Sequence, residues 1–314
     1  MNSSLDSPAL LVAHDAGGAE LIAAWARKHS LQDYACLAEG PARRIFASMP
    51  ARLLGRAEAL GRLAEFRTVL TGSSWGSDLE KVFIELGTAL GIRTITYLDH
   101  WTDYRERFVS AGRLLLPSEI WVADEHAEMI ARATFPGQPV LKAGNCYLDE
   151  IATQVKALSL PAQARAGKKR ALFMSEPLSA AAERKFGDRN YFGYTEFDAL
   201  AGFLAHARQH WAQELETVRI RRHPSEVAGK FSAFLSEAPP FPVVECGEAP
   251  LVEDCAWADW IAGCQSMALV VGLLAGKQVF SAIPAGGRPS AIPYPGIASL
   301  FQPHPRAQIQ GMTT

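Results

Sequence analysis

Short apolar runs alternate with amphipathic stretches through the first half of the chain. The run 8–13 is apolar throughout, which is typical of a strand buried on both faces, and helical spacing follows it. This alternation continues to residue 143 and predicts a parallel sheet with helices on both faces. The expected strands are 8–13, 34–37, 68–71, 93–98, 120–123 and 140–143, and the expected helices are 21–29, 41–48, 55–64, 79–90 and 124–134.

A polar stretch rich in Ala, Gln and Lys at 153–169 interrupts the pattern and predicts a domain linker. A second alternation follows, and the Gly- and Pro-rich end of the chain has little periodicity. Its expected strands are 170–174, 217–221, 260–262 and 279–282, with helices at 195–213 and 267–275. We therefore expect an α/β protein of two Rossmann-like domains, 1–155 and 168–290, that face a ligand-binding cleft, with 291–314 as a tail that packs back on the first domain.

The overall charge narrows the range of partners. A net charge of −2 over 314 residues gives no basic field for nucleic acid or an anionic membrane surface. The five cysteines are scattered without the spacing of a zinc site and indicate free thiols in a reducing compartment. We find no signal peptide or membrane-spanning run, so we expect a cytoplasmic protein, or one peripheral to the inner face of the membrane.

Two segments of the second half together predict a phosphate site. Residues 219–226 (RIRRHPSE) read as a strand that ends in His223-Pro224. A small-residue turn, Gly263-Cys264-Gln265-Ser266, opens the helix 267–275, and we expect Gln265 and Ser266 to contact the donor. The first turn of that helix offers backbone N–H groups and a hydroxyl to an anion at the edge where open α/β sheets bind ligands. We add Glu226 and the turn residues Ser175 and Glu176 to this expected donor site. The alternative is an ordinary βαβ unit with a small turn.

The first strand is followed by HDAGGAE (14–20), a turn that carries titratable side chains at the end of the strand. Asp15 or His14 at a strand end is placed to act as a general base on a hydroxyl. Gly17 and Gly18 let the backbone turn sharply or pass close to a ligand. Asp15 as a helix cap is the alternative. No G-x-G-x-x-G fingerprint is present, so we expect no nicotinamide or flavin cofactor.

Two further clusters follow strands of the first half. Ser73 and Ser74 in GSSWGSD (72–78) can hydrogen-bond a sugar or phosphate, although Ser77 or Asp78 as a plain helix cap is favoured there, with Glu80 and Lys81 on the outer face of the helix. The run 98–108 (LDHWTDYRERF) has the aromatic and cationic groups that recognise carbohydrates and carboxylates. Its expected acceptor- or sugar-binding residues are Asp99, His100, Trp101, Tyr104, Arg105 and Arg107. A surface helix over a packed Trp is the alternative.

These features together resemble glycosyltransferases of the GT-B fold. The His-Pro pair with a downstream serine is most similar to bacterial enzymes that use CMP-activated acidic sugars, such as sialyltransferases and Kdo transferases, and to polyol-phosphate transferases. The resemblance implies that His223 and Ser266 contact the donor phosphate and that Asp15 is the base. It implies an inverting, metal-independent transfer by one displacement from a CMP-sugar, or a UDP- or CDP-sugar, to a hydroxyl of a cell-surface glycan or protein.

Two other functions remain open at this point. A sugar-nucleotide 2-epimerase or hydrolase of the same fold also places His and carboxylate groups around the anomeric centre. A non-catalytic nucleotide-sugar-binding partner in polysaccharide assembly is the third hypothesis. It would leave the three clusters of the first half without a role.

Overall fold

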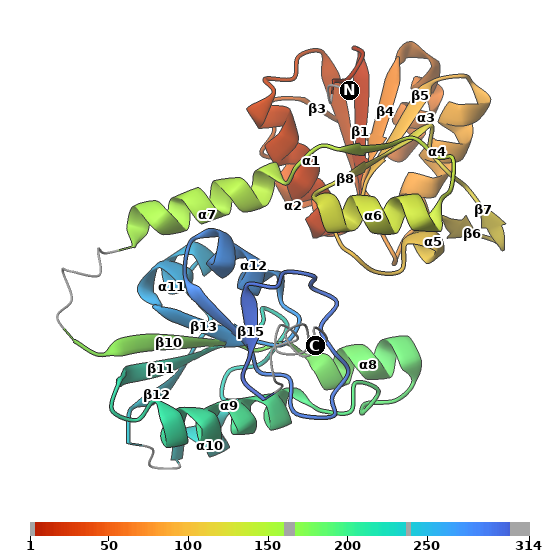
Figure 1. Cartoon of the computed structure of the whole chain (residues 1–314). Helices are drawn as coiled ribbons and strands as arrows, with labels where there is room; N and C mark the ends of the chain where they lie inside the picture. The colour runs from red at the N-terminus through yellow and green to blue at the C-terminus, as the bar shows by residue number, and fades with distance from the viewer. Residues whose placement is uncertain (1–3, 160–166, 237–239, 302–314) are drawn as a thin grey trace, which may run out of the picture. The chain divides into compact units, whose positions relative to one another are not determined.

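The computed structural model describes residues 4–159, 167–236 and 240–301. The chain divides into two compact units, residues 1–150 and 151–314, each with its own parallel sheet (Figure 1). The predicted cleft between the two domains stays a prediction. The helix α7 (Cys146–Leu158) continues through the start of the expected linker, and β10 begins at Lys169. The segment 160–166 lies outside the described residues.

The sheet of the first unit has the strand order β3-β2-β1-β4-β5-β8-β9, and neighbouring strands in it run parallel. Its strands are β1 (Ala9–Ala13), β2 (Tyr34–Ala38), β3 (Arg52–Leu54), β4 (Thr68–Thr71), β5 (Arg93–Tyr97), β8 (Glu119–Val122) and β9 (Val140–Lys142). Its helices are α1 (Ala16–Lys28), α2 (Ala42–Phe46), α3 (Arg56–Gly61), α4 (Leu79–Ala89), α5 (Tyr104–Arg107) and α6 (Glu125–Thr134), with the short helical turn η1 (Leu63–Glu65). A hairpin of β6 (Val109–Ser110) and β7 (Arg113–Leu114) stands outside the sheet.

The apolar strand β1 explains why both faces of this sheet are covered. Successive side chains of a strand point to opposite faces. Leu11 accordingly packs in one cluster with Trp25 of α1, whereas Leu10 packs in another with Phe83 of α4. All of β1 is buried, as the continuous apolar run predicts.

The second unit repeats this plan with the strand order β12-β11-β10-β13-β14-β15. Its strands are β10 (Lys169–Met174), β11 (Leu215–Arg221), β12 (Val243–Cys246), β13 (Trp260–Gly263), β14 (Gln278–Ser281) and β15 (Ile297–Ser299). Its helices are α8 (Leu178–Phe186), α9 (Glu196–His210), α10 (Ser232–Ser236), α11 (Leu251–Trp257) and α12 (Met267–Leu274). The expected tail thus contributes β15, paired with β14, while residues 302–314 lie outside the described part.

Each sheet has one point at which the chain changes direction across it. In the first unit, β2 and β3 lie on one side of β1, and β4 and the strands that follow it lie on the other side. In the second unit, β11 and β12 lie on one side of β10, and β13 and the strands that follow it lie on the other side. Loops at the carboxyl ends of such neighbours form the crevice where open α/β sheets bind ligands. Among the described residues, no helix is long and apolar enough to cross a membrane.

Candidate functional site

In the second unit, the turn between β13 and α12 forms one wall of the candidate site. The hydroxyl oxygen of Ser266, the N-cap of α12, accepts a hydrogen bond from the Ala268 N–H at 3.2 Å. This leaves an orderly helix start of the kind that binds anions. Behind the turn, the Oε1 atom of Glu176 accepts hydrogen bonds from the N–H groups of Cys264 (3.1 Å) and Gln265 (2.8 Å). Two backbone donors of the turn just before α12 are therefore already bound to a carboxyl group.

The second wall is the His223-Pro224 loop after β11. Glu226 holds this loop with two hydrogen bonds. Its Oε2 atom accepts one from the His223 N–H (2.8 Å), and its backbone N–H donates one to the His223 carbonyl (2.8 Å). The other carboxylate oxygen of Glu226 accepts from the Ser175 hydroxyl (3.0 Å) and the Lys230 ammonium (2.6 Å). Glu226 is only 8% exposed. Its carboxylate therefore positions the loop, while its predicted contact with a donor stays a prediction.

Lys230 is a member of this network that the sequence did not indicate. Its ammonium group also contacts Glu196 at 2.5 Å, and Glu196 accepts from the N–H (3.0 Å) and hydroxyl (2.8 Å) of Ser179. One cation therefore neutralises two buried carboxylates from different elements. The spacing of Glu226 and Lys230, four residues apart, was the only local signal for the pair.

A pocket of about 270 Å³ lies between these walls at the carboxyl ends of the strands. It brings together four residues expected from the sequence, from three separate loops. Its lining residues are Met174, Ser175, Arg221, Arg222, His223, Pro224, Leu251, Ser266, Met267 and Ala268. The pocket combines an apolar wall with hydroxyl, imidazole and guanidinium groups. This mixture suits a nucleotide with its phosphate.

The tautomer of His223 suits a hydrogen bond to phosphate. Its Nδ1 atom accepts from the Ser225 N–H at 3.2 Å, so we assign the proton of the neutral ring to Nε2. Partial loss of water around the ring lowers the pKa of His223, against the opposing effect of Glu226. A neutral imidazole at pH 7 can thus donate its Nε2–H to an anion. Burial has the opposite effect on the nearby acid and raises the pKa of Glu176 to about 7.

In the first unit, the loop after β1 holds His14 and Asp15 in direct contact. The Nδ1 atom of His14 lies 2.7 Å from Asp15 Oδ1, and the backbone N–H of Trp75 donates to Asp15 Oδ2 at 3.4 Å. Asp15 is the N-cap residue of α1 by position, but its side chain makes no capping hydrogen bond. The helix-cap alternative for this carboxylate therefore has no support in the geometry.

Glu80 of α4 supports this loop through a hydrogen bond to the His14 backbone. The prediction that Glu80 and Lys81 lie on the outer face of their helix was wrong. Glu80 and Lys81 are buried rather than on the outer face of α4, at 3% and 7% exposure. Glu80 Oε1 accepts from the His14 N–H at 2.8 Å, while its buried Oε2 has no hydrogen-bond partner among the described residues. Burial raises the pKa of Glu80. Only the tertiary packing of α4 reveals this contact, since the local sequence favours an exposed pair.

Three glycines make room for the cluster in the first unit. A Cβ atom at Gly17 would lie 2.3 Å from Asp99 Oδ2, and one at Gly18 would lie 3.0 Å from the Gly72 Cα atom. A Cβ at Gly40, whose φ is +51°, would lie 2.6 Å from the Nε2 atom of His14. The close backbone approach expected of Gly17 and Gly18 is thus an approach to other parts of the protein.

Ser73, Asp99 and Arg107 form a connected group on the loops after β4 and β5. The Arg107 Nη1 atom donates to the Ser73 carbonyl (2.7 Å), the Ser73 hydroxyl (3.0 Å) and Asp99 Oδ1 (3.2 Å). Ser74 is buried, and its hydroxyl donates to the Ser77 carbonyl at 3.3 Å. Arg107 therefore holds two loops together, whereas Arg105 is exposed, and its role in ligand recognition stays a prediction.

The aromatic residues of the 98–108 run do not form an exposed sugar platform. Trp101 and Tyr104 are 6% and 2% exposed, and the Trp101 indole N–H donates to the Asp124 carboxylate at 3.0 Å. The packed-Trp alternative is the better description of these two rings. His100 is partly exposed and stays a candidate with Arg105.

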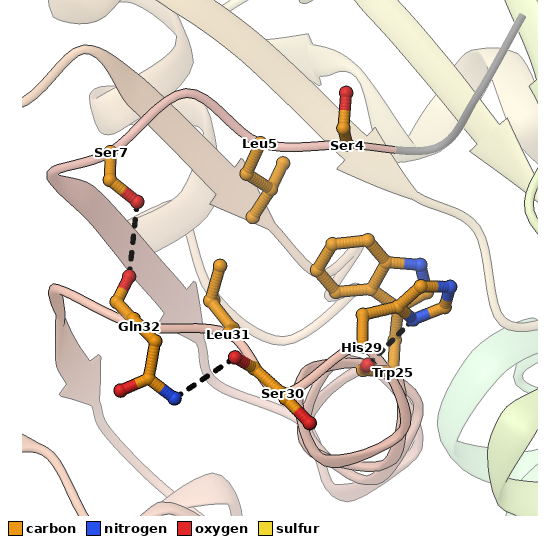
Figure 2. Close-up of a pocket in the computed structure, with 8 residues that line it drawn as sticks. All are labelled: Ser4, Leu5, Ser7, Trp25, His29, Ser30, Leu31 and Gln32. Carbon is orange, nitrogen blue, oxygen red and sulfur yellow. Dashed lines mark hydrogen bonds between the residues drawn. The ribbon is translucent and has the colours of Figure 1, made fainter.

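A larger pocket of about 600 Å³ lies at the opposite end of the first sheet (Figure 2). It is lined by the segment before β1 and by the end of α1 with its following loop, where the His29 and Trp25 rings stack at 4.4 Å. This is the amino end of the strands, away from the loops that carry His14, Ser73 and Asp99. The pocket contains none of the residues expected to act on a ligand.

The comparisons with known proteins support the fold. No protein-family model matches the sequence, and no curated protein matches it. Among solved structures, UDP-GlcNAc 2-epimerase from Neisseria meningitidis bound to UDP-GlcNAc aligns with a TM-score of 0.60 at 13% identity over 92% of this chain and 86% of that one. The 2-epimerase from Methanocaldococcus jannaschii gives 0.56 at 9% identity over 87% and 83%, and the S. aureus MnaA–UDP complex gives 0.55 at 10% over 88% and 79%. The chain thus has a GT-B-like fold of two parallel α/β units.

Proposed function

We propose that this protein is an enzyme that acts on nucleotide sugars and that its second unit binds the nucleotide. The pocket at the β10–β13 switch point carries the proposal, because it joins Ser175, His223 and Ser266 at the start of α12. The hydroxyl groups and the Nε2–H of His223 are donors suited to phosphate oxygens. Structures of similar fold that are bound to UDP or UDP-GlcNAc support a nucleotide as the ligand.

The reaction we favour is glycosyl transfer with inversion, and a CMP-sugar is the favoured donor. An acceptor hydroxyl loses its proton to Asp15, and its oxygen bonds to the anomeric carbon as the bond to the nucleotide phosphate breaks. His223, Ser266 and the start of α12 stabilise the leaving phosphate. Asp15 fits its role because one oxygen is held by His14 while the other accepts a long hydrogen bond from the Trp75 N–H.

Turnover of Asp15→Asn tests this assignment. The amide keeps the shape of the carboxylate but cannot accept the proton, so we expect turnover to fall about 10²–10⁴-fold with nucleotide affinity unchanged. Sugar transfer to glycan acceptors would be followed by mass spectrometry, with Asp33→Asn, an exposed carboxylate before β2, as the control. Full activity in Asp15→Asn, with loss in His14→Ala or Asp99→Asn, would show that another residue is the base.

Epimerisation at C2 of a UDP-sugar is the second candidate, and the fold similarity to two UDP-GlcNAc 2-epimerases favours it. Incubation with UDP-GlcNAc in the absence of any acceptor separates the two reactions. A 2-epimerase converts this substrate to its C2 epimer, which NMR detects, whereas a transferase leaves it unchanged until an acceptor is added. Binding with thermal stabilisation but no turnover in any arm would instead identify a non-catalytic partner.

A further inference from the structure

We propose that Glu176 is a further, proton-linked residue of the anion site: phosphate binding beside Ser266 is coupled to uptake of a proton by Glu176. This inference rests on the proposed function, because it concerns the same pocket of the second unit. It assigns to Glu176 a different role from direct contact with the donor.

The geometry places Glu176 and the pocket on one short turn. Glu176 accepts from the N–H groups of Cys264 and Gln265, and the next residue is Ser266, which lines the pocket. Glu176 itself is not among the lining residues. The carboxyl group therefore occupies backbone donors immediately before the helix start at which the phosphate is expected.

A carboxylate and a phosphate at this turn compete for the same electrostatic stabilisation. The start of a helix carries about half a positive charge. α12 is uncharged throughout, so its own side chains add no cation there. An ionised Glu176 and a bound phosphate then repel each other across one turn, whereas a neutral carboxyl group removes that repulsion.

The surroundings of Glu176 make the proton easy to gain. Burial is the largest influence on its pKa and raises it to about 7, with a smaller upward effect from Glu226. The backbone N–H groups of 264–266 act in the opposite direction. Cys264 and Tyr194 also face it, and burial raises the pKa of both, so they are neutral at pH 7. The charge of Glu226 is itself compensated by Lys230.

The coupled step balances without rearrangement of the turn. Ionised Glu176, one solvent proton and the ligand give a complex with neutral Glu176. The Oε1 atom of the neutral acid still accepts the hydrogen bonds from Cys264 and Gln265, because a carbonyl oxygen is also an acceptor, although a weaker one than a carboxylate oxygen. The charge of the bound phosphate thus takes the place of the carboxylate charge at this turn.

Calorimetric titration of the full chain at several pH values tests the coupling. CDP, UDP and inorganic pyrophosphate would be titrated in buffers of different ionisation enthalpy, which counts the protons taken up on binding. We expect wild-type affinity to fall about tenfold more than that of Glu176→Gln between about pH 6 and pH 8. Titration of His223 and of the ligand phosphate changes the affinity of both proteins with pH. The difference between wild type and Glu176→Gln in this pH dependence therefore reports on Glu176 alone. Glu183→Gln, an exposed carboxylate on α8, is the matched control.

A second measurement uses the unaltered protein. The ¹³C signal of the Glu176 carboxyl carbon, assigned with the Gln variant, would be titrated with and without ligand, and its midpoint should move to higher pH when ligand is bound. Equal pH dependence of wild type and Glu176→Gln, or an unmoved midpoint, would overturn the inference. The inference and the proposed function can fail separately. If pyrophosphate binds with proton uptake but no nucleotide binds, the inference stands and the proposed nucleotide function fails. If a nucleotide binds without proton uptake, the function stands and the inference fails; if no anion binds, both fail.

Discussion

At the scale of single residues, the glycines of the first unit show how tightly the switch-point loops meet. Gly18 lies in the first turn of α1 and is packed against the backbone at Gly72, which cannot yield as a side chain can. Gly18→Ala should therefore lower the free energy of unfolding by about 1–3 kcal/mol, although alanine is normally the better helix residue. Urea unfolding measures it. Gly61→Ala in α3 has nothing within 4 Å and should be neutral or stabilising; an equal loss in both variants would contradict the packing argument.

Glu176 predicts a pH dependence of stability that needs no ligand. Its pKa in the folded protein is about 7, above its usual 4.5, so the folded state binds this proton more tightly than the unfolded state. The stability linked to this proton is fully present below about pH 4.5 and is lost as the pH rises through 7. Glu176→Gln has no such proton and should not show this loss. The free energy of unfolding of the variant, relative to that of the wild type, should therefore rise by about 1–3 kcal/mol from pH 4.5 to pH 8. Urea unfolding at both pH values measures this change, with Glu183→Gln as the control. The same change in stability with pH in the wild type and in both variants would contradict the burial argument.

At the scale of elements, Lys230 connects the loops after β10 and β11 to α9 through Glu226 and Glu196. Lys230→Met leaves two buried carboxylates without their cation and should cost about 3 kcal/mol of stability at pH 7. Glu226→Gln in the same chain should restore part of it. Lys142→Met, whose partner Glu125 is on the surface, is the matched control and should have little effect. Thermal unfolding of the three variants and the wild type measures the outcome, and an unchanged Tm in Lys230→Met would show that the network is not coupled.

The sequence pattern predicted most of the longer elements because their apolar periodicity is unambiguous, but the helices α7 and α8 were not predicted. Strand β1 is buried along its whole length, and Ser266 caps α12 as its position before an apolar run suggests. Strand β3 was missed because it has three residues, two of them exposed. β15 was missed because it lies in a Gly- and Pro-rich segment and forms only through pairing with β14. Short strands of this kind depend on their neighbours rather than on their own composition.

The candidate site followed from the same reasoning only in part. Residues at strand ends, such as Asp15, His223 and Ser266, were found because a parallel sheet brings its carboxyl ends to one edge. The burial of Trp101 and Glu80 could not be found, because the direction of a side chain in a loop or first helical turn is set by tertiary packing. Buried polar residues such as these need partners, and those partners lie far away in the sequence.

At the scale of the whole molecule, the two units divide the work that we propose. The second carries the nucleotide pocket and its supporting network of Glu226, Lys230 and Glu196, and the first carries His14 and Asp15 on a loop supported by Glu80. Both sites stand at the switch point of their own sheet. The account therefore depends first on whether the second unit binds a nucleotide.

Calorimetric titration of the full chain with CMP, CDP, UDP and GDP tests this claim most directly. We predict that at least one of them binds, with CMP or another pyrimidine nucleotide favoured. His223→Ala and Ser266→Ala should each weaken its binding by about 1–3 kcal/mol, the cost of a lost hydrogen bond to a charged group. Ser30→Ala, at the far end of the first unit, should leave the affinity unchanged. No binding of any of the four nucleotides, or binding that neither pocket substitution weakens, would contradict the account.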